Sequence, residues 1–344
     1  MRESKRVKQM ETIIIDMKDE LKEQDIKRVA KLLRSGEIVA FPTETVYGVG
    51  ADATNEAAVQ KIFQAKGRPG DNPLNVLVAS KEELYELVQD VPEYVEKMLD
   101  AFSPGPITYV LKNKGRVAKT VTAGLPTLGV RIPDHPVALS IIREAKVPLA
   151  APSANRSGKP SPTKAEHVIE DLYGRIAAIV DGGATNIGLE STVVDCTGDH
   201  PVILRPGAIT AEQIVDATGL SCTVYEKKAA NAKTQAPALK YKHYTPEVPL
   251  ILVNVEKMEM EILKAKAENK RIALIYQTAE LAQLEVDEKL RLGDDEVEVA
   301  QQLYEILRSF KNEKVDVVFC EYPIFEHNQA IINRLTEAAA KIIE

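Results

Sequence analysis

Short apolar runs with the character of β-strands alternate with helical patterns along the first two hundred residues of the chain. This alternation is typical of α/β domains, in which strands and helices follow one another around a sheet. The expected strands are Ile38–Phe41, Leu74–Val78, Ile107–Leu111, Leu128–Ile132, Val147–Ala151, Ile176–Val180, Thr192–Asp195 and Val202–Leu204. The length of 344 residues is sufficient for two domains of ordinary size.

Helix starts are also visible in the sequence. A Ser or Thr followed three residues later by Glu or Gln is a capping box, in which side chains satisfy the first free N–H groups of a helix. Three such pairs are Ser80 with Glu83, Thr163 with Glu166, and Thr210 with Gln213. A further helix is expected over Ala57–Lys66, ending at Gly67.

The periodicity fades after Gly219, and residues 226–238 are rich in Lys, Ala, Asn and Thr without an apolar face, as in a linker. Beyond this segment, strands are expected at Leu250–Val253, Ile272–Tyr276 and Val315–Cys320, and helices at Glu256–Ala267, Val297–Phe310 and Gln329–Ile343. We therefore expect a domain over residues 12–220, a linker over 221–247, and a smaller α/β domain over 248–344.

Charge is unevenly distributed along the chain. The last part, Val248–Glu344, has 12 basic and 19 acidic residues, which accounts for the whole net charge of −7. Because nucleic-acid phosphates are repelled by an acidic surface, a polyanion is expected to bind the first part instead.

Several classes of protein are excluded by composition. No apolar run approaches the roughly 18 residues of a membrane span, and the chain begins with charged residues rather than an apolar signal core, so we expect a cytoplasmic protein without membrane contact. Cys196, Cys222 and Cys320 are widely spaced, which indicates reduced thiols rather than a disulfide framework. The five histidines have no metal-ligand spacing, and His135 and His167 are expected at helix starts.

Four loop segments concentrate small polar and basic residues beside the expected strands: Phe41–Gly48, Lys66–Pro73, Ala150–Thr163, and Gly188–Thr192 with Arg205 one strand later. Ligands of open α/β sheets usually bind at strand ends. The cations, hydroxyls and amides of these segments are suited to holding an anion such as phosphate. The chain has no GxxxxGK[ST] motif and therefore no P-loop.

Each of these segments also has a purely structural interpretation, which the residues alone leave open. Lys66 and Arg68 suit the solvated carboxyl end of a helix, where cations complement the helix dipole. Arg131 lies in an apolar run, where it either holds an anion or forms a structural salt bridge. There is no GxSxG elbow and no cysteine in a catalytic context. The expected site thus binds anions and offers no covalent nucleophile.

Taken together, the chain resembles the YrdC-like family, and specifically its longer two-domain L-threonylcarbamoyladenylate synthases. The resemblance rests on motifs that occur in order: PTETVYG, KGRPGDNPL, SAN followed by GKPSPTKAEHV, GLESTVVD, LRPGAI and KYKHYTP. It implies a twisted open α/β domain with a large electropositive cavity, joined by a linker to a small Rossmann-like domain.

The resemblance also implies a reaction. L-threonine, bicarbonate and ATP would give threonylcarbamoyl-AMP and pyrophosphate, with Mg²⁺ accompanying the triphosphate. The product would then serve downstream tRNA threonylcarbamoyltransferase proteins, which modify an adenosine beside the anticodon. Direct contact with tRNA is left open.

The resemblance further implies a role for each of several residues. Lys66 and Arg68 would be catalytic and would contact ATP phosphates. The other ATP-binding residues would be Asn72, Thr127, Ser153, Asn155, Ser161, Arg205 and Tyr244. The threonine pocket would be formed by Thr43, Arg131, Ala151 and Ser191, with Arg131 on the carboxylate. Leu77 stands where many relatives have a histidine, and Asn75 is a possible replacement, although strand alternation predicts that Asn75 and Leu77 share a face.

Two other functions remain as alternatives. One is a carbamoyltransferase-type enzyme that handles carbamoyl adenylate. The other is an RNA-binding, translation-associated protein, for which the sequence shows no basic patch with interleaved aromatics. We also expect residues 240–246 to fold back over the cavity, because two tyrosines and a histidine follow the polar linker there.

Overall fold

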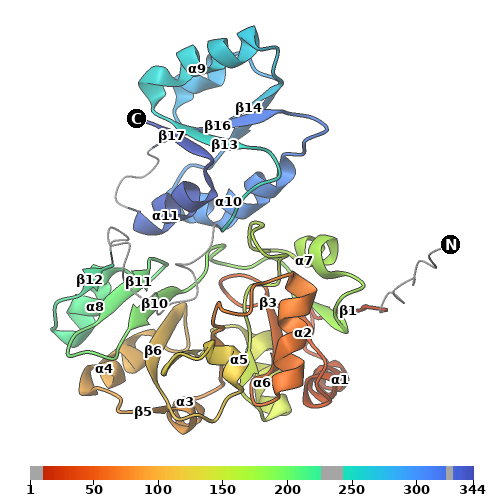
Figure 1. Ribbon diagram of the computed structural model, residues 1–344, viewed down its shortest axis with the longest axis vertical. Helices are drawn as coiled ribbons and strands as arrows, with labels where there is room; N and C mark the ends of the chain where they lie inside the picture. The colour runs from red at the N-terminus through yellow and green to blue at the C-terminus, as the bar shows by residue number, and fades with distance from the viewer. Residues whose placement is uncertain (1–10, 226–242, 323–327) are drawn as a thin grey trace.

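The computed structural model describes residues 11–225, 243–322 and 328–344. Within these residues the chain forms two separate β-sheets, each flanked by helices (Figure 1). The strands of the first sheet are β1 (Ile13–Asp16), β2 (Val39–Phe41), β3 (Gly48–Asp52), β4 (Val76–Leu77), β5 (Val88–Gln89), β6 (Ile107–Asn113), β7 (Thr127–Arg131), β8 (Leu149–Ala150), β9 (Ala178–Asp181), β10 (Thr192–Asp195), β11 (Val202–Arg205) and β12 (Thr223–Val224). Its helices are α1 (Glu23–Arg34), α2 (Glu56–Lys66), α3 (Lys81–Leu87), α4 (Glu93–Phe102), α5 (Lys119–Thr122), α6 (Pro136–Ala145), α7 (Ala165–Leu172) and α8 (Ala211–Thr218).

The first sheet is open and mixed. Its order is β1-β9-β2-β3-β8-β4-β7-β6-β10-β11-β12, with β5 paired to β6, and it contains both parallel and antiparallel neighbours. Both of its faces are covered. Along β2, Val39 and Phe41 pack toward α1 and α6, whereas Ala40 packs into the larger cluster that contains α2 and α4. Strands buried on both faces explain why these segments read as continuous apolar runs.

The second sheet is fully parallel, as expected of a doubly wound domain. It contains β13 (Leu250–Val253), β14 (Ile272–Tyr276), β15 (Glu288–Arg291), β16 (Val317–Glu321) and β17 (Lys341–Ile343), in the order β15-β14-β16-β13-β17. Its helices are α9 (Val255–Ala267), α10 (Glu296–Ser309) and α11 (Gln329–Ala338), with a short 3₁₀ helix at Ala279–Gln283. Because β16 lies between β13 and β14, the order differs from that of the dinucleotide-binding Rossmann sheet.

The helices α10 and α11 lie between the second sheet and the first domain, and α9 covers the far face (Figure 1). The contact between the domains is close at Gly188, whose φ is +83° and whose missing Cβ would lie 2.3 Å from the carbonyl oxygen of Ala300 on α10. A side chain at position 188 would therefore force the domains apart. Val46, Leu189 and Tyr244 of the first part share a buried apolar cluster with α10 and α11.

The mixed α/β class is confirmed, and several local predictions need correction. The helix expected to end at Ile343 stops at Ala338, and Lys341–Ile343 forms the edge strand β17. The Thr210–Gln213 capping box is present, but α7 begins after Lys164, so the box expected at Thr163 is absent. His135 caps α6 as expected, its ring nitrogen accepting from the N–H of Val137. No helix in the described ranges is both long and apolar enough to span a bilayer.

Candidate active site

A cavity in the first domain brings the four polar loop segments together. It is lined by Thr45, Val46, Arg68, Pro73, Leu74, Asn75, Arg131, Ala151, Pro152, Ser153, Asn155, Lys159, Ser161, Glu190, Ser191, Arg205, His243 and Tyr244. Four of these side chains are cationic and one, Glu190, is a carboxylate, so the lining has an excess of positive charge. An arrangement of this kind favours a polyanionic ligand such as a nucleoside triphosphate.

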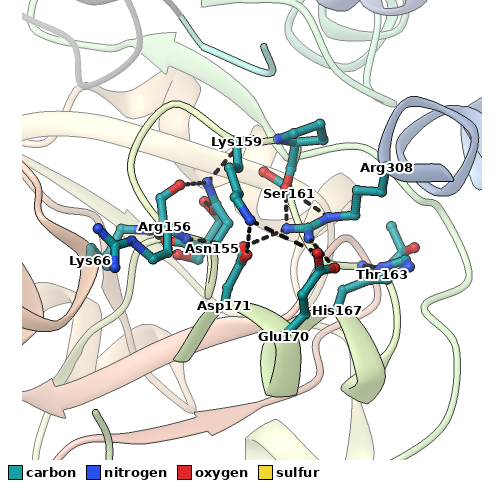
Figure 2. Close-up of polar contacts among 12 residues, drawn as sticks. Lys66, Asn155, Arg156, Lys159, Ser161, Thr163, His167, Glu170, Asp171 and Arg308 are labelled. Carbon is teal, nitrogen blue, oxygen red and sulfur yellow. Dashed lines mark hydrogen bonds and ion pairs between the residues drawn. The ribbon is translucent and has the colours of Figure 1, made fainter. Parts of the chain in front are cut away.

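The loop after β8 forms one wall, and its polar groups are fixed by one another (Figure 2). The Oγ of Ser153 donates to Oδ1 of Asn155 at 2.5 Å, and Nδ2 of Asn155 donates to the carbonyl oxygens of Arg156 (2.9 Å) and Lys159 (2.8 Å). At the end of the loop, the Oγ of Ser161 donates to Oε1 of Glu190. These hydrogen bonds hold the loop in a defined shape before any ligand enters.

Lys66 binds the backbone of this loop and does not line the cavity. Its side chain is buried, and Nζ donates to the carbonyl oxygens of Ser153 (2.5 Å) and Asn155 (2.6 Å). Burial, with a smaller contribution from the charge of Arg68, lowers the pKa of Lys66 well below its ordinary value. Lys66 is thus placed as a support of the loop in this structure, whereas Arg68 lies on the cavity wall.

Two buried charges of other elements complete the support of the loop. Asp171 on α7 accepts from the Arg156 N–H (3.2 Å) and the Lys159 ammonium (2.9 Å). Arg308 of α10 donates to Asp171 at 2.7 Å and to the carbonyl oxygen of Pro160 at 2.6 Å. Figure 2 shows Arg308 reaching this loop from the second domain. The second domain therefore contributes directly to the loop that carries Ser153, Asn155 and Ser161.

Arg131 forms a structural salt bridge, which is one of the two alternatives that the sequence left open. Its Nη2 lies 2.6 Å from Oε2 of Glu44, and both side chains are buried. Its Nε donates to the carbonyl oxygen of Gly105, and Nη1 donates to Oγ1 of Thr45. Arg131 also lines the cavity, so the salt bridge holds its guanidinium at the cavity wall.

Leu77 and Asn75 have different surroundings. Leu77 packs into the apolar cluster with α1 and α6, whereas Asn75 precedes β4 and lines the cavity. Among the described residues, Oδ1 of Asn75 is buried and accepts no hydrogen bond. An amide oxygen without a partner in a cavity wall is suited to accepting one from a ligand.

The remaining expected residues divide into two groups. The first group lies on the cavity wall and is hydrogen-bonded within it. Arg205 donates twice to the carbonyl oxygen of Ser191. The Ala151 N–H donates to the carbonyl oxygen of Asn75 at 2.9 Å. Thr43, Asn72 and Thr127 are not part of the lining. Thr43 stabilises the turn at Thr45–Val46 through its Oγ1, Asn72 is buried beside Arg68, and Thr127 starts β7 at the end opposite Arg131.

His243 and Tyr244 lie on the cavity wall, and residues 240–242 of the expected lid lie outside the described residues. The Thr245 N–H donates to the carbonyl oxygen of Gly158, which fastens this segment to the polar loop. Burial, together with the charge of Arg68, lowers the pKa of His243 to about 4, so its imidazole is neutral at physiological pH. The space left in the cavity is about 100 Å³.

Comparisons with known proteins agree over both domains. A family model for Sua5, YciO and YrdC, described as telomere recombination, matches residues 31–207, and one described as the threonylcarbamoyl-AMP synthase C-terminal domain matches residues 209–340. The threonylcarbamoyl-AMP synthase of Bacillus subtilis is 46% identical over 333 residues, covering 94% of this chain and 96% of that protein. That of Pyrococcus abyssi is 44% identical, covering 95% and 98%. The chain belongs to the threonylcarbamoyl-AMP synthase family.

Solved structures place the chain in the two-domain type of this family. The crystal structure of P. abyssi Sua5 complexed with L-threonine matches with a TM-score of 0.90 at 42% identity, covering 96% of this chain and 99% of that chain. Escherichia coli YciO matches with a TM-score of 0.53 at 20% identity, covering 60% and 99%, which shows the fold of the first domain alone. Membership of the threonylcarbamoyl-AMP synthase family makes the chain an enzyme of the nucleotidyltransferase class.

Some cavity residues were not among those predicted. Glu190, Lys159 and His243 lie on the wall, and all three stand inside motifs of the threonylcarbamoyl-AMP synthase family that the sequence displays. Arg308 and Arg334 support the site from α10 and α11. Both occur on the apolar stripe of an amphipathic helix, where a charged side chain signals a buried partner.

Glu190 should make the stability of the enzyme sensitive to acid. Burial alone would raise its pKa, but the charges of Arg334 and Arg205 and the hydrogen bonds from Ser161 and Arg334 hold the pKa at about 2. An unfolded glutamate has a pKa of about 4.3. The contribution of Glu190, on the order of 3 kcal/mol, is therefore present above that value and is lost as the pH falls toward 2. Urea denaturation at pH 7 and pH 3 measures the part of this contribution, about 2 kcal/mol, that is lost by pH 3.

In that experiment, Glu190→Gln should show a smaller loss of unfolding free energy between pH 7 and pH 3 than the wild type. Glu305→Gln is the matched control, because Glu305 pairs with Lys164 at the exposed edge of the same interface. A pH dependence in Glu190→Gln equal to that of the wild type would contradict the assignment.

Proposed function

We propose that the enzyme makes L-threonylcarbamoyl-AMP and pyrophosphate from L-threonine, bicarbonate and ATP in the cavity of its first domain. The observation that carries this proposal is the convergence of Arg68, Arg131, Lys159 and Arg205 on one cavity with hydroxyl and amide groups. Such a lining suits a triphosphate and a small amino acid. The relatives that match nearly the whole chain are threonylcarbamoyl-AMP synthases, and one of them was crystallised with L-threonine.

In the proposed reaction the substrate supplies the nucleophile. The threonine amine captures carbon dioxide and loses a proton, and an oxygen of the resulting carbamate attacks the α-phosphorus of ATP. The bond to the β-phosphate oxygen breaks, and pyrophosphate leaves. The protein then needs to position the reactants and to stabilise negative charge. In the described residues the thiols fit this assignment, because burial raises the pKa values of Cys196, Cys222 and Cys320.

We assign ATP to the side of the cavity formed by Arg68, Ser153, Asn155, Ser161 and Arg205. Lys66 contributes through the loop carbonyls that it holds. Asn72 and Thr127, which lie off the present lining, would contact the nucleotide only after a local rearrangement.

We assign threonine to the side formed by Arg131, Ala151 and Ser191, with Asn75 as an additional polar contact. Leu77, which stands where many relatives have a histidine, packs in the apolar core. Asn75 would therefore supply the polar contact in place of that histidine. Thr43 acts there through the turn that presents Thr45.

Mg²⁺ is expected to arrive with the nucleotide. The described residues contain no group of three or more His, Cys, Asp or Glu side chains arranged to hold a metal ion. Glu190, the carboxylate of the cavity, already binds Ser161, Tyr304 and Arg334. Because Mg²⁺ is usually held by substrate phosphates and water with few protein ligands, the triphosphate itself would supply its coordination.

The segment at His243 and Tyr244 would have to move for ATP to enter. A space of about 100 Å³ is smaller than the roughly 300–1,000 Å³ of typical ligand sites. After entry, closure would exclude water from the product, a mixed anhydride that water would otherwise hydrolyse. Transfer of the product to tRNA would require separate threonylcarbamoyltransferase proteins. We place these steps in the cytoplasm.

The closing segment yields a prediction at Tyr244. Its buried ring lines the cavity, so Tyr244→Ala should weaken ATP binding by about tenfold and threonine binding less, as expected for the loss of roughly 1.4 kcal/mol of aromatic contact. Isothermal titration with each substrate measures both affinities. Tyr173→Ala, at an exposed tyrosine, is the control. Equal losses for ATP and threonine would contradict a specific role beside the nucleotide.

The proposed reaction is tested by pyrophosphate release from ATP, which should require both threonine and bicarbonate. Release that requires a carbamoyl donor in place of threonine would favour the carbamoyltransferase alternative. RNA binding without any release would favour the translation-associated alternative. Mass spectrometry of the product distinguishes threonylcarbamoyl-AMP from carbamoyl-AMP directly.

A further inference from the structure

Two side chains of the second domain reach the cavity wall of the first. Arg334 of α11 is fully buried, and its Nε donates to Oε2 of Glu190 at 2.8 Å. Its Nη1 donates to the carbonyl oxygen of Pro206 at 2.9 Å. Tyr304 of α10, also fully buried, donates its hydroxyl to the same Oε2 of Glu190 at 2.8 Å. Thus both donors of the second domain converge on one carboxylate oxygen of Glu190.

The same two side chains enclose Tyr244. The Tyr304 ring is stacked on the Tyr244 ring, with centroids 5.3 Å apart and an interplanar angle of 26°. The Arg334 guanidinium lies 5.5 Å from the centroid of the Tyr244 ring. Tyr244 has a φ of +59°, a backbone conformation that a tyrosine adopts only where its surroundings enforce it. The second domain therefore determines the position of a residue that lines the cavity.

We propose that Arg334 and Tyr304 are positioning residues of the active site, which fix Glu190 and Tyr244 and neutralise the carboxylate of Glu190 beside the nucleotide. The proposal rests on the proposed function, since it assumes that ATP occupies this cavity. It assigns to the second domain a direct part in nucleotide affinity.

The physical reason is the balance of charge around Glu190. Its Oε1 accepts from Ser161, a residue of the wall assigned to ATP, and its Oε2 is covered by Arg334 and Tyr304. Without Arg334, a buried carboxylate would face the triphosphate with one counter-charge fewer. Repulsion between like charges at low dielectric weakens binding of the anion. Threonine has no net charge at physiological pH, so its affinity should change much less.

The test compares ATP and threonine affinities in Arg334→Gln. We expect ATP binding and the KM for ATP to weaken by about tenfold, while threonine affinity stays within about twofold of the wild type. Arg271→Gln is the matched control, because Arg271 pairs with Asp316 within the second domain, away from the cavity. It should leave both affinities unchanged.

A double variant separates charge balance from structural support. Glu190→Gln combined with Arg334→Gln removes both charges, so ATP affinity should recover to within about threefold of the wild type. A purely structural role predicts no recovery, because the double variant lacks even more of the contact. Failure to recover, or equal losses for ATP and threonine in Arg334→Gln, would overturn the proposal.

If Arg334→Gln fails to fold, Tyr304→Phe decides the question. It removes one hydrogen bond to Glu190 and keeps the ring stacked on Tyr244. ATP affinity should weaken by about threefold with threonine affinity unchanged, and an unchanged ATP affinity would refute the proposal. Titration with ATP alone requires no turnover, so these comparisons can be read even if the wild type makes no threonylcarbamoyl-AMP. That outcome would contradict the proposed function separately.

Discussion

Arg131→Met should lower the unfolding free energy by about 3–5 kcal/mol and weaken threonine affinity by about one to two orders of magnitude. The first effect arises because Glu44 would be left buried without its ion-pair partner. The second follows from the proposed assignment of Arg131 to the threonine carboxylate, because a charge-assisted hydrogen bond of that kind contributes roughly 1.5–3 kcal/mol. Urea denaturation and isothermal titration with threonine measure the two effects.

The two effects can be separated in one further variant. Glu44→Gln combined with Arg131→Met removes both charges, so it should recover much of the lost stability without recovering threonine affinity. Arg116→Met is the control, because Arg116 pairs with Glu86 on the surface. If the double variant binds threonine as tightly as the wild type, Arg131 has only a structural role.

Arg308→Met should lower the unfolding free energy by about 3 kcal/mol. This is the lower end of the range for breaking a buried ion pair, because Asp171 keeps Lys159 and the Arg156 N–H as partners. Loss of the contact with the Pro160 carbonyl should also loosen the polar loop. We therefore expect weaker ATP binding together with the lower stability, measured by titration and urea denaturation.

Lys311→Met is the matched control for Arg308→Met. Lys311 lies three residues further along and pairs with Glu170 at the rim of the same interface, where solvent screens the interaction. It should change stability much less. Equal effects of the two substitutions would show that Arg308 acts as an ordinary surface charge.

The sequence predicted that the four polar loop segments lie close together. Each of them directly adjoins a buried strand, so all four are confined to the strand ends of the sheet. The strand β3, Gly48–Asp52, was missed, since two glycines and an aspartate give it little strand character. It is nevertheless fully buried between β2 and β8. Tertiary packing, rather than local propensity, makes this segment a strand.

The directions of individual side chains were the least predictable part of the site. Lys66 and Arg68 are close in the sequence, but α2 ends between them at Gly67. As a result, Lys66 binds the carbonyl oxygens of the loop, whereas Arg68 lies on the cavity wall. Similarly, the carboxylate partners of Arg308 and Arg334, Asp171 and Glu190, lie more than a hundred residues away along the chain. Periodicity within one helix carries no information about contacts over that separation.

The two buried arginines that cross the domain interface have a consequence for cooperativity. Opening the interface would leave Arg308, Arg334, Asp171 and Glu190 without their principal partners in a single step. Because opening would also expose the apolar contacts of Val46, Leu189 and Tyr244 with α10 and α11, a state with one domain folded and the other melted should be sparsely populated. The two sheets, although separate in hydrogen bonding, then behave as one thermodynamic unit, and calorimetry should record a single melting transition for the whole chain.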